Sequence, residues 1–331
     1  MKPFAFVFPG QGSQSVGMLD AWGDHPVVVE TLKEASDALG EDLTKLIKEG
    51  PKEALALTTN TQPVMLVAAV AAYRVWMAET GIEPAAVAGH SLGEYSAMVA
   101  AGMLTLAQAT PLVRFRAEAM QAAVPVGVGA MAAILGMDAS KVIAGCEEAT
   151  QAVRSSGGAF SGNINENVNE SAHEIVQAVN FNDPAQTVIA GSKAAVDKAC
   201  EILKANGAKR ALLLAVSAPF HSSLMQPAAE KLKERLESVV FASPRMALFN
   251  NIDVAVEVDA ARIRDALYRQ AFGPVRWVEC VQGIKARGIT MVVECGPGKV
   301  LAGLVKRIDA DMTGLALFDP ASLAEAKGML A

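Results

Sequence analysis

The stretch Ala-Ala-Val-Ala-Gly-His-Ser-Leu-Gly-Glu, residues 85–94, decides the fold that this sequence predicts. Ala85–Ala88 indicates a short buried strand, and Glu94–Ala101 indicates a helix that Gly102 ends. The Gly-x-Ser-x-Gly motif at 89–93 lies between them, which predicts a nucleophile elbow that exposes the Ser91 hydroxyl. Such a motif also occurs in ordinary structural turns, which is the alternative interpretation. The strand before it and the helix after it favour a nucleophilic serine.

The segments around this motif predict an α/β fold, with a hydrolase-like core built on a parallel central sheet. A first strand is expected at Phe4–Phe8, and the same order of strands and helices resumes after Pro219. The core helices are expected at Val27–Leu39, Gln62–Glu79, Leu106–Ala123, Gln226–Ser238 and Lys299–Ile308.

A second, smaller unit is predicted inside this core. Residues 127–216 show the order strand, helix, strand, strand, helix, strand, which is typical of a ferredoxin-like (βαββαβ) subdomain. A long loop rich in Ser, Gly and Asn is expected at Ser155–Ser171. The predicted domains are therefore a discontinuous catalytic core, 1–126 and 217–331, and an inserted subdomain, 127–216.

The composition excludes several classes of protein. The 331 residues are 52% hydrophobic and carry a net charge of −6, which argues against a nucleic-acid-binding protein. No apolar run is long enough to span a membrane, and no signal peptide is evident. The four cysteines have neither disulfide nor metal spacing, so we expect reduced thiols, no metal site and a cytoplasmic protein. We also expect a monomer, because no large apolar stripe is evident.

A serine nucleophile needs a base, and four histidines are available. His90 lies inside the elbow, His25 lies in a loop, and His173 lies beside the long loop. His221 follows Ala211–Val216, a strand that we expect to be buried, and functional groups often gather at such strand ends. An ordinary loop histidine and the catalytic base therefore remain alternatives for His221. An acid partner in the order of α/β-hydrolases is not evident.

Arg116 lies on an apolar stripe of its predicted helix, with Val113 and Met120. A cation in such a position needs a partner. An internal Asp or Glu is one possibility, and a substrate carboxylate gripped by the guanidinium is the other. The loop Gly10–Gln14 resembles a nucleotide-binding loop but lacks its third glycine, so we expect no nucleotide there.

Together these segments resemble the malonyl-CoA:acyl carrier protein transacylase family. The resemblance runs in family order over nearly the whole chain. The matching stretches are FPGQGSQ (8–14), GHSLGE (89–94), VRFR (113–116), GAMAA (129–133), NFN (180–182), APFH (218–221), NN (250–251) and GPGKVL (296–301).

The resemblance implies a role for each residue that matches the family pattern. Ser91 would attack the malonyl thioester, and His221, oriented by the backbone carbonyl of Gln270, would take its proton. The backbone N–H groups of Gln11 and Leu92 would form the oxyanion hole. Arg116 would bind the malonyl carboxylate.

The implied reaction is a ping-pong transfer of malonyl from malonyl-CoA to the phosphopantetheine thiol of acyl carrier protein, without a cofactor of the enzyme's own. It would feed fatty acid or polyketide synthesis. The acidic carrier would dock transiently on a basic patch, for which Lys299, Lys306 and Arg307 are the candidates, and solvated surface charges are the alternative. A serine hydrolase or thioesterase and a non-catalytic carrier-binding module remain the alternative functions. The 155–171 loop is expected to be longer than is usual in the family.

Overall fold

The computed structural model describes residues 2–156 and 174–331. By its internal contacts the chain divides into two compact units. Unit 1 consists of Met1–Ala117, Glu237–Arg264 and Glu279–Ala331. Unit 2 consists of Glu118–Leu236 and Asp265–Val278.

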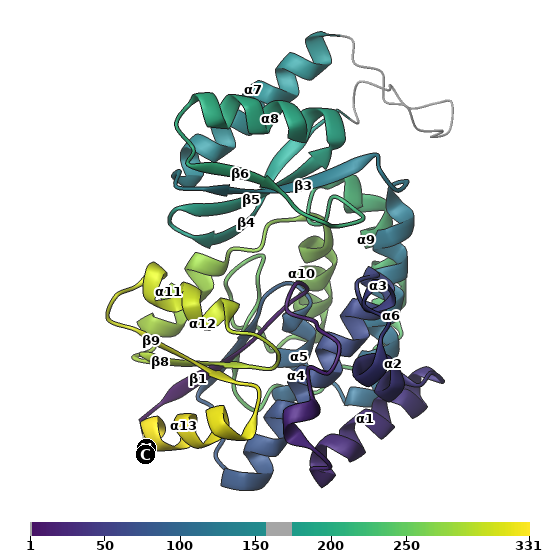
Figure 1. Cartoon of the computed structure of the whole chain (residues 1–331), viewed down its shortest axis with the longest axis vertical. Helices are drawn as coiled ribbons and strands as arrows, with labels where there is room; N and C mark the ends of the chain where they lie inside the picture. Colours follow the sequence, from purple (N-terminus) through teal and green to yellow (C-terminus); the bar gives the residue numbers. More distant parts are fainter. Residues whose placement is uncertain (1, 157–173) are drawn as a thin grey trace. The chain divides into compact units, whose positions relative to one another are not determined.

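Unit 1 is built on a parallel sheet, as predicted (Figure 1). Among the described residues its strand order is β7-β2-β1-β8-β9. Every ladder is parallel, with Phe6 aligned with Val87 of β2 on one side and with Val293 of β8 on the other. The strands are β1 (Phe4–Phe8), β2 (Ala86–Gly89), β7 (Ala247–Phe249), β8 (Met291–Cys295) and β9 (Thr313–Leu317).

The central strand β1 explains why the core forms here. All five of its side chains are buried, and its sequence is an uninterrupted apolar run, as expected for a parallel strand covered on both faces. Phe4 and Phe6 make edge-on ring contacts with Trp76, and Phe6 and Phe8 contact Tyr73. Burying these rings removes a large apolar area from water and fixes the sheet against helix α4.

The helices of unit 1 cover this sheet. Helix α4 is buried along most of its length and packs against α5 and β8, while α12 and α13 pack against β9. The helical segments are η1 (Asp20–Trp22), α1 (Pro26–Leu39), α2 (Leu43–Glu49), α3 (Lys52–Leu55), α4 (Thr58–Thr80), α5 (Gly93–Ala100), α6 (Leu106–Ala123), α10 (Ala260–Phe272), α11 (Trp277–Ala286), α12 (Val300–Ile308) and α13 (Pro320–Leu330). Helices α6, α10 and α11 continue into unit 2.

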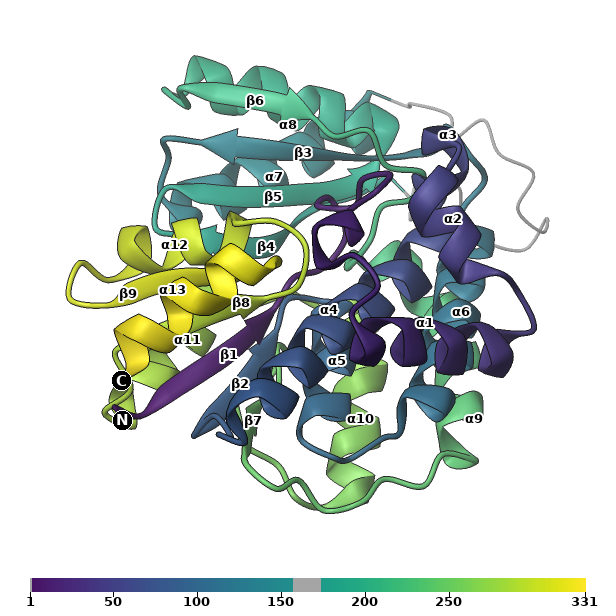
Figure 2. The ribbon, with the colours of Figure 1, turned by 60° about the horizontal axis from the view of Figure 1, so that its bottom comes forward.

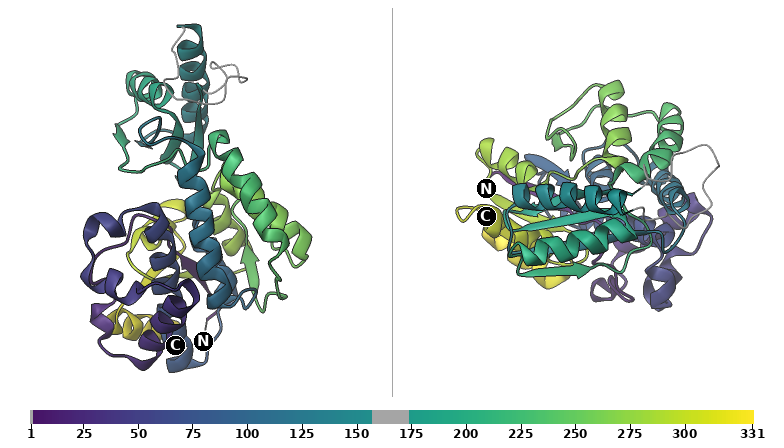
Figure 3. Two further views of the ribbon diagram at one scale, coloured as in Figure 1. Left: turned by 90° about the vertical axis from the view of Figure 1, so that its right-hand side faces the viewer. Right: turned by 90° about the horizontal axis from the view of Figure 1, so that it is seen from above.

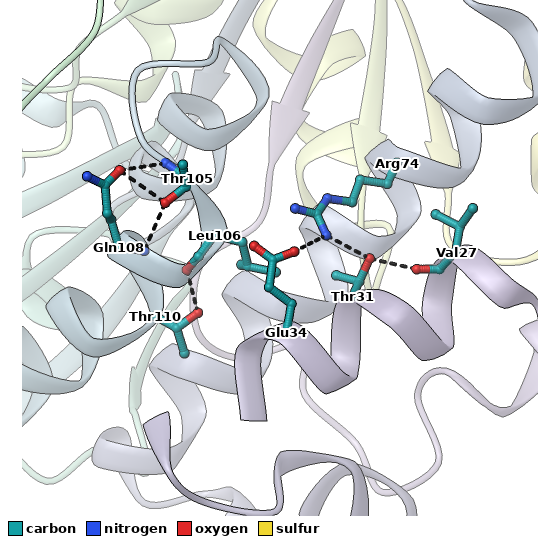
Figure 4. A network of polar contacts seen from close by, with 8 residues as sticks. All are labelled: Val27, Thr31, Glu34, Arg74, Thr105, Leu106, Gln108 and Thr110. Carbon is teal, nitrogen blue, oxygen red and sulfur yellow. Dashed lines mark hydrogen bonds and ion pairs between the residues drawn. The ribbon is translucent and has the colours of Figure 1, made fainter. Parts of the chain in front are cut away.

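Polar contacts connect and terminate these helices (Figure 4). Arg74 of α4 donates from Nη1 to Glu34 (2.7 Å) and to the Thr31 hydroxyl (3.2 Å), both on α1. At the start of α6, the Thr105 hydroxyl accepts a hydrogen bond from the Gln108 backbone N–H, as an N-cap does. The Arg74 contacts thus join α4 to α1, and the Thr105 contact caps the N-terminal end of α6, the helix that carries Arg116.

Unit 2 contains the predicted βαββαβ arrangement (Figure 2). Its antiparallel sheet has the order β4-β5-β3-β6, and α7 and α8 pack side by side against it (Figure 3, right). A buried apolar cluster that includes Ile134, Val142 and Leu203 lies between the sheet and these helices. The elements of unit 2 are β3 (Gly129–Leu135), α7 (Ala139–Ser155), β4 (Val176–Asp183), β5 (Gln186–Ser192), α8 (Lys193–Ala205), β6 (Arg210–Leu213), η3 (Ser223–Met225) and α9 (Gln226–Glu237).

Two expectations need correction here. The strand expected at Ala211–Val216 is β6, which ends at Leu213 and is an exposed edge strand, not a buried one. Leu212 and Leu213 expose 46% and 60% of their surface. Helix α7 runs to Ser155 and has Ser156 as its C-cap residue, so the expected loop at Ser155–Ser171 does not include Ser155. Residues 157–171, like His173, lie outside the described residues.

The predicted domain limits, 1–126 with 217–331 and 127–216, stay a prediction. The division by contacts also counts 118–126, 217–236 and 265–278 with the antiparallel sheet. Within residues 2–156 and 174–331, every helix falls short of the length or hydrophobicity that a membrane crossing needs.

Candidate active site

Ser91 lies at a sharp turn between β2 and α5, in unit 1. Its φ is +53°, a left-handed conformation that non-glycine residues seldom adopt. The turn is possible because its neighbours are glycines: a Cβ at Gly89 would overlap the backbone of Gly93, and a Cβ at Gly93 would overlap the carbonyl of Phe8. The Ser91 region therefore has the strained strand–turn–helix geometry of a nucleophile elbow.

Asn251, in the loop after β7, holds this turn in place. Its side-chain oxygen accepts a hydrogen bond from the Ser91 backbone N–H (2.7 Å), and its amide nitrogen donates to the Gly89 carbonyl (2.7 Å). Its own backbone N–H donates to the carboxylate of Glu94 (2.9 Å), and both residues are fully buried. Asn250 and Asn251 are part of the family resemblance, which implies no role for them. The signal in the sequence is a pair of adjacent asparagines that follows an apolar segment.

Arg116 is brought to the nucleophile by helix α6. Its Nη2 donates to the Ser91 hydroxyl (3.2 Å), its Nη1 donates to Oε1 of Gln62 (2.7 Å), and its guanidinium lies over the Tyr95 ring at 5.5 Å. Only 1% of its surface is exposed. A buried cation in contact with the serine oxygen suits an anionic group that arrives beside the reacting atom.

Burial changes the ionisation of the groups around Arg116. Desolvation lowers the pKa of Arg116, and the nearby Tyr95 and Glu94 partly offset this by favouring the cation. Desolvation also raises the pKa of Tyr95 to about 12, against the opposing effect of Arg116. Tyr95 is therefore a neutral phenol at physiological pH, and its ring face can stabilise the guanidinium.

The two expected oxyanion donors belong to unit 1 as well. Leu92 follows Ser91 directly and is the N-cap residue of α5, where the positive end of the helix dipole favours negative charge. Gln11 lies in the loop after β1, and its side-chain oxygen accepts a hydrogen bond from the Thr58 hydroxyl (2.6 Å). The backbone N–H of His90 donates to the carbonyl of Phe8, which connects the elbow to the end of β1 (2.9 Å).

His221 lies in unit 2 and has an unusual backbone too. Its φ is +66°, and only 4% of its surface is exposed. Its Nδ1 lies 2.8 Å from the backbone carbonyl oxygen of Gln270, on α10. Because a carbonyl can only accept, Nδ1 carries the proton in the neutral ring, which leaves Nε2 as the basic nitrogen. The turn is braced locally by a hydrogen bond from the Ser222 hydroxyl to the Pro219 carbonyl (2.7 Å).

The structure thus brings Ser91, Arg116 and the Gln11 loop together in unit 1, and His221 and Gln270 together in unit 2. Gln62, which bonds to Arg116, and Thr58, which bonds to Gln11, are two further polar residues of this site that the sequence does not predict. The signal was weak: two polar residues one helical turn apart, just before the apolar run of α4. Among the described residues, no group of three or more His, Cys, Asp or Glu side chains is placed to hold a metal ion.

The three candidate docking residues lie on or beside α12. Lys299 is the exposed N-cap residue of α12, and its ammonium group lies over the Phe318 ring at 4.9 Å. Lys306 and Arg307 are exposed in the last turn of the same helix. Their role in docking stays a prediction.

Comparison with known proteins gives a consistent result. The family model described as the acyl transferase domain matches residues 5–159 and 128–313. The malonyl CoA-acyl carrier protein transacylase of Salmonella typhimurium is 49% identical over 327 residues, which cover 98% of this chain and 99% of that protein.

Solved structures show the same similarity. The acyl-carrier-protein S-malonyltransferase of Burkholderia pseudomallei 1710b has 62% sequence identity and a TM-score of 0.90, over 98% of this chain and 99% of that chain. A malonyl-transacylase solved in complex with its type II polyketide synthase acyl-carrier protein has 47% identity and a TM-score of 0.90, with the same coverage.

Proposed function

The chain belongs to the malonyl CoA-acyl carrier protein transacylase family, and from that premise we propose that Ser91, Arg116 and His221 carry out its reaction. The enzyme is an acyltransferase that moves a malonyl group from CoA to acyl carrier protein. This activity fits a role in fatty acid synthesis. The observation that carries the proposal is the buried Arg116 guanidinium, whose Nη2 lies 3.2 Å from the Ser91 hydroxyl.

In the proposed first half-reaction, the Ser91 oxygen attacks the thioester carbonyl carbon of malonyl-CoA. Nε2 of His221 takes the serine proton, and the Gln270 carbonyl stabilises the imidazolium through Nδ1–H. The oxyanion would be held by the backbone N–H groups of Gln11 and Leu92. Collapse of the tetrahedral intermediate breaks the carbon–sulfur bond, and the CoA thiolate takes the proton from His221.

The second half-reaction reverses these steps with a new thiol. His221 takes the proton of the phosphopantetheine thiol, whose sulfur attacks the malonyl-serine ester. The serine oxygen leaves and recovers the proton. Water must be disfavoured as the acceptor, which a buried site and a positioned thiol accomplish together.

Arg116 supports malonyl as the group that is transferred. In malonyl-CoA a single methylene separates the carboxylate from the thioester carbonyl, so a cation that binds the carboxylate must lie close to the nucleophile. Arg116 meets that requirement. Its fork of N–H donors also matches the two oxygens of a carboxylate.

The carrier protein is proposed to dock on Lys299, Lys306 and Arg307 of α12. An exposed basic set would attract an acidic carrier to a protein whose net charge is −6. Reversing these charges should raise KM for the carrier with little effect on kcat.

We also propose that the protein is cytoplasmic and monomeric. Four buried cysteine thiols support a reducing compartment. The exposed edge strand β6 is the surface on which a test for self-association should concentrate.

Intact-mass analysis after mixing the enzyme with malonyl-CoA or acetyl-CoA tests the proposal. We expect a malonyl adduct in the wild type, none in Ser91→Ala, and a selective loss of malonyl over acetyl in Arg116→Ala. Ser96→Ala is the matched control for the first variant, because it removes a buried hydroxyl of α5 that makes no hydrogen bond in the described structure. Arg114→Ala is the control for the second, because Arg114 is on the same helix and pairs with Glu41. Free malonate without an adduct would indicate a hydrolase, and neither product would indicate a binding module.

A further inference from the structure

A continuous chain of side-chain hydrogen bonds joins the nucleophile to the loop after β1. It runs from the Ser91 hydroxyl to Arg116 (3.2 Å), from Arg116 to Gln62 (2.7 Å), from Gln62 to Thr58 (3.3 Å) and from Thr58 to Gln11 (2.6 Å). All five residues belong to unit 1. Gln62 is fully buried and Thr58 is 3% exposed, so water cannot readily replace the hydrogen bond between their side chains.

The chemistry of the donors fixes the direction of every bond in this chain. Arg116 can only donate, so Gln62 must present its oxygen to Nη1 and its amide N–H₂ to Thr58. The Thr58 hydroxyl accepts that bond, and its single proton is then directed to the side-chain oxygen of Gln11. The guanidinium that would bind the carboxylate is therefore linked, through directed hydrogen bonds, to the side chain of the residue whose backbone would bind the oxyanion.

We propose that Gln62 and Thr58 are positioning residues that connect the Arg116 carboxylate site to the Gln11 oxyanion loop. This inference rests on the proposed function, since it takes Arg116 and Gln11 in their proposed roles. Gln62 holds the guanidinium in the orientation that receives the malonyl carboxylate. Thr58 holds the Gln11 side chain, and through it the direction of the Gln11 backbone N–H. Recognition of the acyl carboxylate and stabilisation of the transition state thus share one set of hydrogen bonds.

Gln62→Glu tests the arginine end of this relay. The new carboxylate has the same shape, and it would ionise beside Arg116 and compete with the malonyl carboxylate for the guanidinium. We expect the rate of malonyl loading on Ser91 to fall by about a hundredfold, with a much smaller loss of acetyl loading. Gln62→Met removes the acceptor without adding charge and should lower the malonyl-to-acetyl ratio less, which keeps the test available if the Glu variant does not fold.

Thr58→Val tests the oxyanion end, because it removes the hydroxyl and keeps the shape. Malonyl and acetyl loading should both fall, by about threefold to tenfold, since the oxyanion is common to the two substrates. Thr58→Ser should restore the wild-type rates. Thr110→Val is the matched control, because Thr110 is also buried and lies on the helix that carries Arg116. Among the described residues its hydroxyl bonds only to the Leu106 carbonyl of that helix (2.8 Å; Figure 4).

The deciding measurement is the single-turnover rate of each adduct by rapid-quench mass spectrometry, with thermal melts to confirm folding. In the double variant Gln62→Glu/Thr58→Val, the rate of acetyl loading should equal that of Thr58→Val alone. Each of the two changes removes the same Gln62–Thr58 hydrogen bond, so their effects on it should not add. Equal losses of malonyl and acetyl loading in Gln62→Glu, or wild-type rates in Thr58→Val, would overturn the relay while the proposed function stands. A wild-type enzyme without a malonyl adduct would instead overturn the proposed function itself.

Discussion

Ser91 and His221 both adopt left-handed backbone conformations, yet their turns are stabilised by different means. The Ser91 turn is enclosed by backbone: Gly89 and Gly93 leave no space for a side chain, and three hydrogen bonds of Asn251 bind residues on both sides of it. The His221 turn is braced by a short side-chain bond from Ser222 and reaches α10 through the ring itself.

This difference separates residues that stabilise the fold from a residue that acts mainly in the reaction. Around Ser91 the groups that hold the turn are also the groups that join β1, β2 and α5, so a change there affects the stability of unit 1. At His221 the functional group is the imidazole, and a residue that tolerates the same φ could replace it without disturbing the backbone. Substitutions in the two turns should therefore affect different observables.

The largest effect is expected for Gly93→Ala. The new methyl group would overlap the Phe8 carbonyl, and that backbone cannot move without disrupting the centre of the sheet. The free energy of unfolding should fall by about 4 kcal/mol or more, measured by urea denaturation. Gly303→Ala on α12 is the control, because among the described residues no atom beyond its chain neighbours and its own helix backbone lies within 4 Å of the added methyl. It should raise stability by about 0.5–1 kcal/mol. Equal effects of the two changes would contradict this account of the elbow.

His221→Asn tests the other side of the comparison. Asparagine tolerates a positive φ and keeps an amide donor for the Gln270 carbonyl, but it cannot act as a base. Malonyl loading should fall by about a thousandfold, while the melting temperature changes little. A loss below tenfold would assign the base to another group, and a large loss of stability would place His221 in the same class as the elbow.

Asn251→Ala should have an intermediate effect on stability. It removes two side-chain hydrogen bonds and leaves the Ser91 N–H and the Gly89 carbonyl buried without that partner. We expect a loss of about 2–3 kcal/mol and slower malonyl loading, because the nucleophile is no longer fixed. Asn206→Ala, at the exposed end of α8, should stay within about 0.5 kcal/mol of the wild type. Unchanged stability in Asn251→Ala would show that glycine packing alone maintains the elbow.

Glu294 offers a second test of how buried groups set the stability of unit 1. Only one of the two oxygens of its buried carboxyl accepts a hydrogen bond among the described residues. Its Oε2 accepts from the Ala302 N–H at the start of α12 (2.9 Å), while its Oε1 has no hydrogen-bond partner among the described residues. Burial raises the pKa of Glu294 to about 7, against the opposing effect of the Ala302, Leu301 and Val300 N–H groups.

The sign of the resulting pH dependence follows from linkage. The folded state holds a proton that the unfolded carboxyl, with a pKa near 4.5, has already lost. This contribution to stability is complete below pH 4.5 and is lost as the pH rises to 7. Glu294→Gln should therefore gain about 1–3 kcal/mol relative to the wild type between pH 5 and pH 8, measured by denaturant titration. A constant difference across that range would contradict the raised pKa.

Local sequence predicted the elbow well because its determinants are adjacent. Gly89, Ser91 and Gly93 lie within one turn, and the strand and helix on either side continue the pattern. Helix α6 was predicted with the limits it has, Leu106–Ala123, since its apolar periodicity is regular. The βαββαβ order could also be predicted from local sequence patterns, although the edge strand β6 is exposed and not buried as expected.

The remaining features depend on contacts between distant residues. Nothing in the sequence near His221 shows that its ring meets the carbonyl of Gln270. Elimination among the four histidines leaves its role open, and only the family resemblance implies that it is the base. The roles of Gln62 and Thr58 become visible only in the folded chain, where Arg116 of α6 reaches Gln62 of α4. Strand β9 was missed because it is short and mostly half-exposed, whereas α13 did carry a signal, the capping box of Asp319 and Ser322.

The central place of β1 has a consequence for biosynthesis. On one edge of β1, Ala5 aligns with Ala86 of β2, and on the other edge Phe4 aligns with Met291 of β8. At about 5–20 residues per second, a ribosome needs roughly 15 to 60 s to pass from the first strand to its second partner. Throughout that interval one edge of an aromatic, wholly apolar strand has no partner. The sheet of unit 1 can therefore be completed only late in translation, after β8 and β9 have been made.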